Sequence, residues 1–238
     1  MDQTFQWQRQ LGNSNDDSGV MGIKVDSSGS NVYITGQVDN GNTYQMGLVA
    51  KYNSSGTIQW QKTIPASANN KMVRTSGLAL DSSDNLYITA GSNSAGSYSA
   101  YLFKFDSAGT AQWQRTLTDN TEGRTTTFND VAIDSSNNVY VAGNYYDKAT
   151  IVKYNSSGAL QWQRTFFNVN ESLTAIAVNS NSLCFSGSTS APGGSKPLFG
   201  KLPLDGSRTG SYSIGSYSFA YSASSLTDSA GSLASSTS

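Results

Sequence analysis

The sequence predicts an all-β protein, a β-propeller of about four four-stranded antiparallel blades, because two short phrases recur along it. Gln-Trp-Gln followed by Arg or Lys occurs four times, with the tryptophans 53, 53 and 49 residues apart, at Trp7, Trp60, Trp113 and Trp162. Lysines end short apolar runs at spacings of 53, 49 and 48 residues, at Lys51, Lys104, Lys153 and Lys201. Repeats of about 40 to 50 residues with four strands each are typical of propellers, in which every repeat forms one blade.

Each repeat contains two predicted hairpins. The first hairpins are "IKVDSSGSNVYITG", "LALDSSDNLYITAG", "VAIDSSNNVYVAG" and "IAVNSNSLCFSG", which begin at residues 23, 78, 131 and 176. β-branched and aromatic residues flank an Asp or Asn turn, and Gly or Asn tolerates the positive φ that such turns need. The second hairpin joins the run that ends in Lys to the strand that carries Trp. No segment has apolar residues at helical spacing over three turns.

The predicted propeller spans residues 1–206, in units of about 12–64, 65–117, 118–166 and 167–206 with an N-terminal strand at 3–11. This strand has no first three strands before it, and the fourth unit has no Trp. We therefore expect the N-terminal strand to complete the last blade and to close the ring, which leaves no open sheet edge. Alternatively, 208–215 closes the fourth unit and 4–11 pair with another chain, or the chain is part of a longer array. Residues 207–222 form an extra strand segment, and 223–238 are a low-complexity Ser/Thr-rich tail.

Residues that every unit repeats are predicted to be structural. One tryptophan per unit suits the seam between neighbouring blades, because its large apolar ring needs burial and its N–H needs an acceptor. The repeated lysines line a central channel or pair with the turn carboxylates Asp26, Asp81 and Asp134. Cys184 occupies the position of Tyr33, Tyr87 and Tyr140 and is predicted to be a buried, small apolar residue.

The composition argues against several classes of function. Charged residues make up 13% of the chain, against about 25% in an average domain. The net charge is −1 and no basic run occurs, so nucleic acid is not an expected partner. No apolar run is long enough to insert in a membrane, and the N-terminus lacks a signal-peptide pattern. The single cysteine forms no internal disulfide framework.

Catalysis has little support, because the sequence contains no His and so no Ser-His-Asp or Cys-His arrangement. The only glutamates are Glu122 and Glu171, so glycoside hydrolysis would require an additional Asp from another loop, such as Asp147 or Asp16. The turn sequences lack the loop length and terminal Glu of an EF-hand, so no metal is expected, and no cofactor is.

The variable connections all fall on one face of the predicted propeller, and we expect binding there, because loops on a rigid scaffold commonly carry recognition. Tyr, Asn, Asp and Arg side chains on this face mix flat aromatic surface with polar groups, which suits glycans and polar protein surfaces. The candidate binding residues are Asp16, Asp17, Asp39, Asn42, Tyr44, Arg74, Asn93, Tyr98, Arg124, Tyr145, Tyr146 and Asp147. The alternative interpretation of each is an ordinary solvated loop residue.

The phrases "DVAIDSSNNVYVAG" and "IVKYNSSGALQWQRT" resemble the beta-propeller repeat of bacterial surface proteins and of virion structural proteins of marine bacteriophages, notably those of cyanobacteria. The resemblance covers about residues 3–206, and "LPLDGSRTGSYSIGSYSFAYSASSLTDSAGS" resembles the region that follows the repeats in such phage proteins. It implies a tail-associated or fibre-associated virion component. Expected partners are other virion proteins or copies of itself, and a host-surface glycan or protein. The alternative is an adhesive repeat protein at a bacterial surface or outside the cell. The fourth unit departs from the pattern, since it lacks both the Trp and the Asp-Ser-Ser turn.

Overall fold

The structure, a computed structural model, describes residues 6–11, 18–39, 45–65, 72–94, 97–118, 125–167, 171–191, 194–214, 217–224 and 226–231. Within these residues all regular structure is β, and no helix that could span a membrane occurs. The first unit consists of β1 (Gly19–Val25), β2 (Asn31–Asp39), β3 (Gln45–Asn53) and β4 (Ile58–Ile64). The second unit consists of β5 (Met72–Leu80), β6 (Leu86–Ser94), β7 (Ser97–Phe105) and β8 (Ala111–Thr118).

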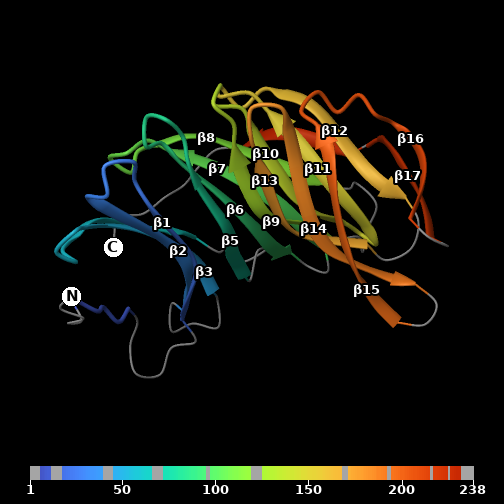
Figure 1. Cartoon of the computed structure of the whole chain (residues 1–238). Helices are drawn as coiled ribbons and strands as arrows, with labels where there is room; N and C mark the ends of the chain where they lie inside the picture. The colour runs from blue at the N-terminus through green and yellow to red at the C-terminus, as the bar shows by residue number, and fades with distance from the viewer. Residues whose placement is uncertain are drawn as a thin grey trace.

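The third unit repeats this arrangement, and the described residues of the fourth form three strands. The third unit consists of β9 (Thr126–Ile133), β10 (Val139–Tyr145), β11 (Lys148–Tyr154) and β12 (Leu160–Phe167). The fourth unit consists of β13 (Glu171–Val178), β14 (Ser182–Ala191) and β15 (Gly194–Pro203). Consecutive strands within each unit pair antiparallel, and the units follow one another from left to right in Figure 1. The predicted all-β class and the antiparallel pairing are thus confirmed.

The hairpin turns within each unit are built by the repeated Asp and Asn residues. In the second unit the Oδ1 atom of Asp81 accepts hydrogen bonds from the backbone N–H groups of Ser83 (2.9 Å) and Asn85 (3.0 Å). Asn53 Oδ1 does the same for Ser55 (3.1 Å) and Thr57 (2.8 Å) in the second hairpin of the first unit. A side chain that satisfies the turn backbone in this way fixes where each strand ends.

The hydrophobic core lies between units. One cluster joins Tyr33 and Val49 of the first unit to Leu78 and Ile88 of the second. Equivalent clusters join the second unit to the third, and the third to the fourth. Because each sheet gives one face to each neighbour, a unit in the middle of the array is covered on both faces.

The segment after the fourth unit returns along the array and extends two earlier sheets. It forms β16 (Gly210–Ile214), β17 (Tyr217–Ala223) and β18 (Thr227–Gly231). β17 pairs with β12 and with β16, whereas β18 pairs with β8. The low-complexity sequence from 223 onward predicted a tail without a core. That prediction is wrong for 226–231, because β18 adds to a sheet edge and Leu226 is buried in the core between the second and third units.

Asp228 of β18 helps to fix this returning segment. Its Oδ1 atom accepts a hydrogen bond from the Tyr154 hydroxyl at 2.9 Å. Burial raises the pKa of Asp228, although the Tyr154 hydrogen bond and the positive charge of Arg115 act in the opposite direction. Burial, together with the negative charge of Asp228, likewise raises the pKa of Tyr154.

The expected completion of the fourth unit is not seen in the described residues. Residues 6–11 form no strand, and among the strands that the structure describes β15 pairs only with β14. β16 lies within the alternative segment, 208–215, and pairs with β17 rather than with β15. Figure 1 places the N-terminal segment beside the first unit, with β15 at the opposite end of the array. The fourth unit therefore has a free strand edge in the part of the chain described.

Candidate interaction surfaces

The tryptophans form the repeated contact between units. Trp60 lies on Gly109, in the second hairpin turn of the next unit, and its Nε1 donates to the Ser107 carbonyl at 3.2 Å. A Cβ on Gly109 would lie 2.9 Å from the indole ring, and the φ of Gly109 is +81°, so no other residue fits without strain. The same pairing occurs for Trp113 with Gly158 and for Trp162 with Gly206.

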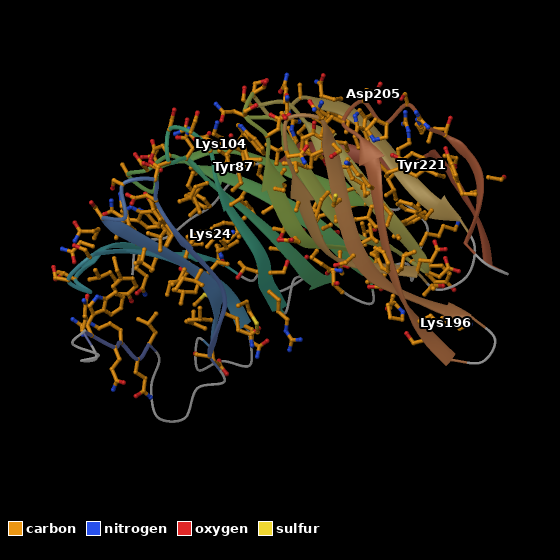
Figure 2. All side chains as sticks on the ribbon, in the orientation of Figure 1. Lys24, Tyr87, Lys104, Lys196, Asp205 and Tyr221 are labelled. Atoms are coloured by element: carbon orange, nitrogen blue, oxygen red, sulfur yellow. The ribbon has the colours of Figure 1, made fainter. Side chains whose placement is uncertain are left out.

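The repeated lysines belong to the same seam. Lys104 lies with its Nζ 5.0 Å from the centre of the Tyr87 ring and 3.8 Å from Asp81, and it donates to the Ser156 carbonyl of the next unit at 3.2 Å. Figure 2 shows Tyr87 and Lys104 close together in the second unit. Lys51 and Lys153 have equivalent ring contacts, with Tyr33 at 5.1 Å and with Tyr140 at 5.0 Å. The lysines therefore support the seam, and their pairing with turn carboxylates is seen between Lys104 and Asp81.

The turn carboxylates are held in their ionised form. Burial raises the pKa of Asp81, but hydrogen bonds from Asn85, Ser83 and Tyr87 outweigh it, so the net pKa is lowered. At Asp26 the hydrogen bond from the Asn31 side chain is the largest influence and lowers the pKa to about 2. Burial, followed by the neighbouring charge of Asp81, raises the pKa of Tyr87. These groups are structural partners within each hairpin.

The predicted loop face is described only in part. Asp16, Asp17, Asn42, Tyr44, Arg124 and the alternative acid Glu122 lie outside the described residues. Asn93 and Tyr98 stand opposite each other in the β6–β7 ladder, with side chains outside the description, and Asp39 ends β2. Arg74 is in β5 and donates from Nε to Gln45 Oε1 of the first unit at 3.3 Å. Among the described candidates, Arg74 thus bridges two units.

Tyr145 and Tyr146 have opposite environments although they are adjacent. Tyr145 is 8% exposed and belongs to the core between the second and third units, so its assignment to a binding loop is wrong. β10 continues through Tyr145 because only two residues, Tyr146 and Asp147, separate it from its partner Lys148. Tyr146 is 56% exposed with a φ of +56°.

Backbone hydrogen bonds fix the Tyr146 turn against neighbouring segments. The Tyr146 N–H donates to the Thr125 carbonyl at 2.6 Å. The Asp147 carbonyl accepts from the N–H of Glu171, which is buried at the start of β13, at 2.8 Å. Tyr146 is therefore exposed to solvent on a turn whose backbone is hydrogen-bonded to Thr125 on one side and to Glu171 on the other. Among the described residues no group of three or more His, Cys, Asp and Glu side chains is placed to hold a metal ion.

The first unit exposes positions that are buried in every later unit. Ile23 of β1 is 64% exposed, whereas its equivalents Leu78, Val131 and Ile176 are 4%, 5% and 6% exposed. Val20 likewise faces solvent, whereas Thr75, Phe128 and Leu173 are buried. A groove of about 380 Å³ lies here, and its walls include Ile23, Val20, Leu11 and Trp7.

The fourth unit exposes the opposite half of the same contact. Phe199 of β15 is 75% exposed, whereas its equivalents Val49, Leu102 and Ile151 are each 0% exposed. A groove of about 590 Å³ lies beside β15, and its walls include Phe199, Lys201 and Tyr221 of β17. In Figure 2, Asp205 and Lys196 mark the two ends of this edge.

Cys184 in the fourth unit is exposed, contrary to the prediction that it is buried. The tyrosines at this position in the earlier units pack edge-on against Trp60, Trp113 and Trp162 at centroid distances of 5.8 to 6.1 Å. No tryptophan of a fourth strand covers Cys184 in the described part of the fourth unit. Alignment of the four repeats would have identified Ile23, Val20 and Phe199 as core positions, but not that they lie at open ends.

Comparison with known proteins gives a likeness of fold alone. No protein-family model matches the chain, and no curated protein matches it. A crystal structure of a protein of unknown function from Bacteroides caccae is similar over 88% of this chain and 71% of its own, with a TM-score of 0.50 and 8% identity. At this identity the likeness supports the all-β architecture and carries no function.

Proposed function

We propose that this chain is a non-enzymatic, β-propeller-type interaction module that forms part of a larger structural assembly. The observation that carries the proposal is that the two ends of the array expose the two halves of a contact that is buried three times inside it. Ile23 and Val20 represent one half, and Phe199 represents the other. Contiguous exposed apolar surface of this kind marks sites of protein interaction.

The assembly that we propose is a virion, in which the chain is a tail-associated or fibre-associated component. Support comes from the resemblance of the repeat phrases and of the segment that follows them to phage structural proteins. The alternative is an adhesive repeat protein at a bacterial cell surface or outside the cell.

The loop face is proposed to bind a protein or a cell-surface glycan. Tyr146 supports this role, because a solvent-exposed aromatic ring on a turn fixed by backbone hydrogen bonds can stack on a sugar or a polar surface without a large loss of entropy. Tyr146→Ala is expected to weaken binding to whole cells or to a glycan array, and Leu160→Ala, at an exposed residue next to the β11–β12 hairpin turn and outside the loop face, is the control.

The experiment that tests assembly is immunogold labelling of the native protein together with sedimentation of its source material. We expect the native chain to sediment with large particles and the label to lie on their surface. A native chain that is found only as a free monomer, with no particle labelled, would overturn the proposal.

A further inference from the structure

We infer that the fourth unit is completed by residues 6–11 of a second copy of this chain, so that copies join head to tail. The inference rests on the proposed function and names the partner of the two open ends. Its starting point is that residues 6–11 carry the fourth-strand phrase "QWQRQL", and that the fourth unit lacks a strand with this phrase.

The register of the three complete units specifies how the added strand would pair. Trp60, Trp113 and Trp162 stand opposite Lys51, Lys104 and Lys153. Two residues further along, basic side chains stand opposite the buried apolar position, in the pairs Lys62 with Val49, Arg115 with Leu102, and Arg164 with Ile151. The same register places Trp7 opposite Lys201 and Arg9 opposite Phe199.

The repeated hydrogen bonds of the seam point to one further donor and one further acceptor at the two open ends of the array. The donor is the Lys201 side chain in the fourth unit, and the acceptor is the Ser54 carbonyl in the first unit. The Ser107 carbonyl accepts from both Trp60 Nε1 and Lys51 Nζ, each at 3.2 Å. The carbonyls of Ser156 and Leu204 each accept from the equivalent Trp and Lys. Ser54 is the equivalent carbonyl in the first unit. Of the described side chains, only Trp7 donates to it, at 2.9 Å, and Lys201 has no hydrogen bond to a described residue. In a head-to-tail contact, Lys201 Nζ of one copy therefore donates to the Ser54 carbonyl of the next copy, as the equivalent lysines do within the chain.

The N-terminal segment already has the position that this contact requires. Trp7 lies on Gly56 as Trp60 lies on Gly109, and Arg9 Nε donates to the Gly56 carbonyl at 2.8 Å, as Arg164 does to Gly206 at 3.0 Å. Inside the array, each tryptophan strand pairs with its own unit while its ring packs on the next unit. Residues 6–11 are thus seated on a following unit and lack only the preceding sheet.

The preceding sheet is better supplied by a second copy than by the chain's own fourth unit, because that unit lies far from residues 6–11. Figure 1 shows the N-terminal segment and β15 at opposite ends of the array. A second copy can place its first unit against β15 while its own Trp7 stays on Gly56. Strand addition of this kind gives main-chain hydrogen bonds along the free edge. Because the contact joins two different surfaces, it repeats from copy to copy and generates a ring or a filament.

The test is a disulfide trap between Arg9→Cys on one chain and Phe199→Cys on another, each with Cys184→Ser. Residues opposite each other in antiparallel strands have Cα atoms about 4.5–5.5 Å apart, which a disulfide spans. After mixing and oxidation with diamide, we expect a cross-linked heterodimer. Lys196→Cys, which is exposed but out of register, is the matched control, and its cross-linked fraction should be at least about tenfold lower because the thiols are not held together.

The chain that carries both Arg9→Cys and Phe199→Cys distinguishes the two ways of completing the fourth unit. Head-to-tail joining gives a ladder of cross-linked species. A cross-linked monomer instead shows closure of the chain on itself and overturns the inference, as does the absence of in-register cross-linking.

Sedimentation of chains without added cysteines gives an independent readout. Phe199→Asp or Ile23→Asp is expected to weaken self-association by roughly tenfold or more, since each removes apolar burial from the contact. Leu160→Asp, at an exposed apolar residue of the third unit, should leave it unchanged. Purified wild-type chain that stays monomeric at all concentrations overturns the inference. If native particles still contain the protein, the proposed function stands with a different partner at the ends.

Discussion

The seams between consecutive units and the open face of the first unit are made of the same repeated positions in two different environments. Leu78 and Ile23 are equivalent residues of the first strand, yet Leu78 is buried and Ile23 is 64% exposed. Trp113 and Trp7 make the same ring contact with a turn glycine, but only Trp113 belongs to a strand that is paired. The comparison shows that the neighbouring unit, rather than the residue itself, determines the burial of these positions.

The largest expected difference between the two regions concerns the tryptophans. Trp113→Ala removes a ring packed between two sheets, and we expect it to lower the free energy of unfolding by about 3 kcal/mol. Trp7→Ala is expected to lower it by about 1 kcal/mol or less, because residues 6–11 are unpaired in the single chain. Chemical denaturation at low protein concentration measures both. Equal losses would show that the N-terminal segment is as integral to the fold as an inner strand.

The apolar positions of the first strand provide a second comparison. Leu78→Ala should destabilise the chain by about 2 kcal/mol or more, because it leaves a cavity in a filled core. Ile23→Ala should change the stability of the dilute chain by about 0.5 kcal/mol or less, because most of the side chain is already in water. Thermal unfolding of the two variants distinguishes these outcomes. A strongly destabilised Ile23→Ala chain would mean that the first face is covered in solution.

Substitutions at two turn glycines distinguish the stability cost of backbone strain from the cost of contact with a tryptophan ring. Gly109→Ala combines a positive φ with an approach of 2.9 Å to the Trp60 ring, and we expect a loss of about 2 kcal/mol. Gly29 also has a positive φ, but nothing lies within 4 Å of its added Cβ, so Gly29→Ala should cost about 1 kcal/mol. Denaturation midpoints of the two variants test this order. If Gly29→Ala and Gly109→Ala lower the free energy of unfolding equally, contact with the Trp60 ring does not contribute to the cost at Gly109.

The smallest expected effect concerns the turn carboxylate Asp81. Its pKa is lowered in the folded chain, so its ionised form contributes stability above the unfolded pKa of about 3.9. That contribution is lost as the pH falls through the folded pKa. Asp81→Asn should therefore be less stable than the wild type at neutral pH, with a difference that narrows below about pH 4. Unfolding curves measured from pH 7 to pH 2 check this, and a difference that widens in acid would contradict it.

The sequence predicted the repeated elements well because their signals are local. The Asp and Asn turns and the alternation of "NVYIT" or "NVYVA" specify hairpins, and each was found where the repeat placed it. Tyr145 was misassigned because the length of the β10–β11 turn, which decides where the strand ends, is not marked by a turn glycine. β18 was missed because "TDSAG" has few β-forming residues and becomes a strand by adding to the edge of β8.

The sequence alone determined the all-β class, the repeat, the turn chemistry and the positions of the seam tryptophans and lysines, because these depend on residues close together in the chain. Only the tertiary structure decided which of the equivalent positions are covered. Whether Ile23, Phe199 and Cys184 are buried depends on the presence of a neighbouring sheet, and no residue near them in the sequence encodes that neighbour. The path of the returning segment also depends on tertiary structure, because β17 and β18 pair with the edge strands of the third and second units, β12 and β8.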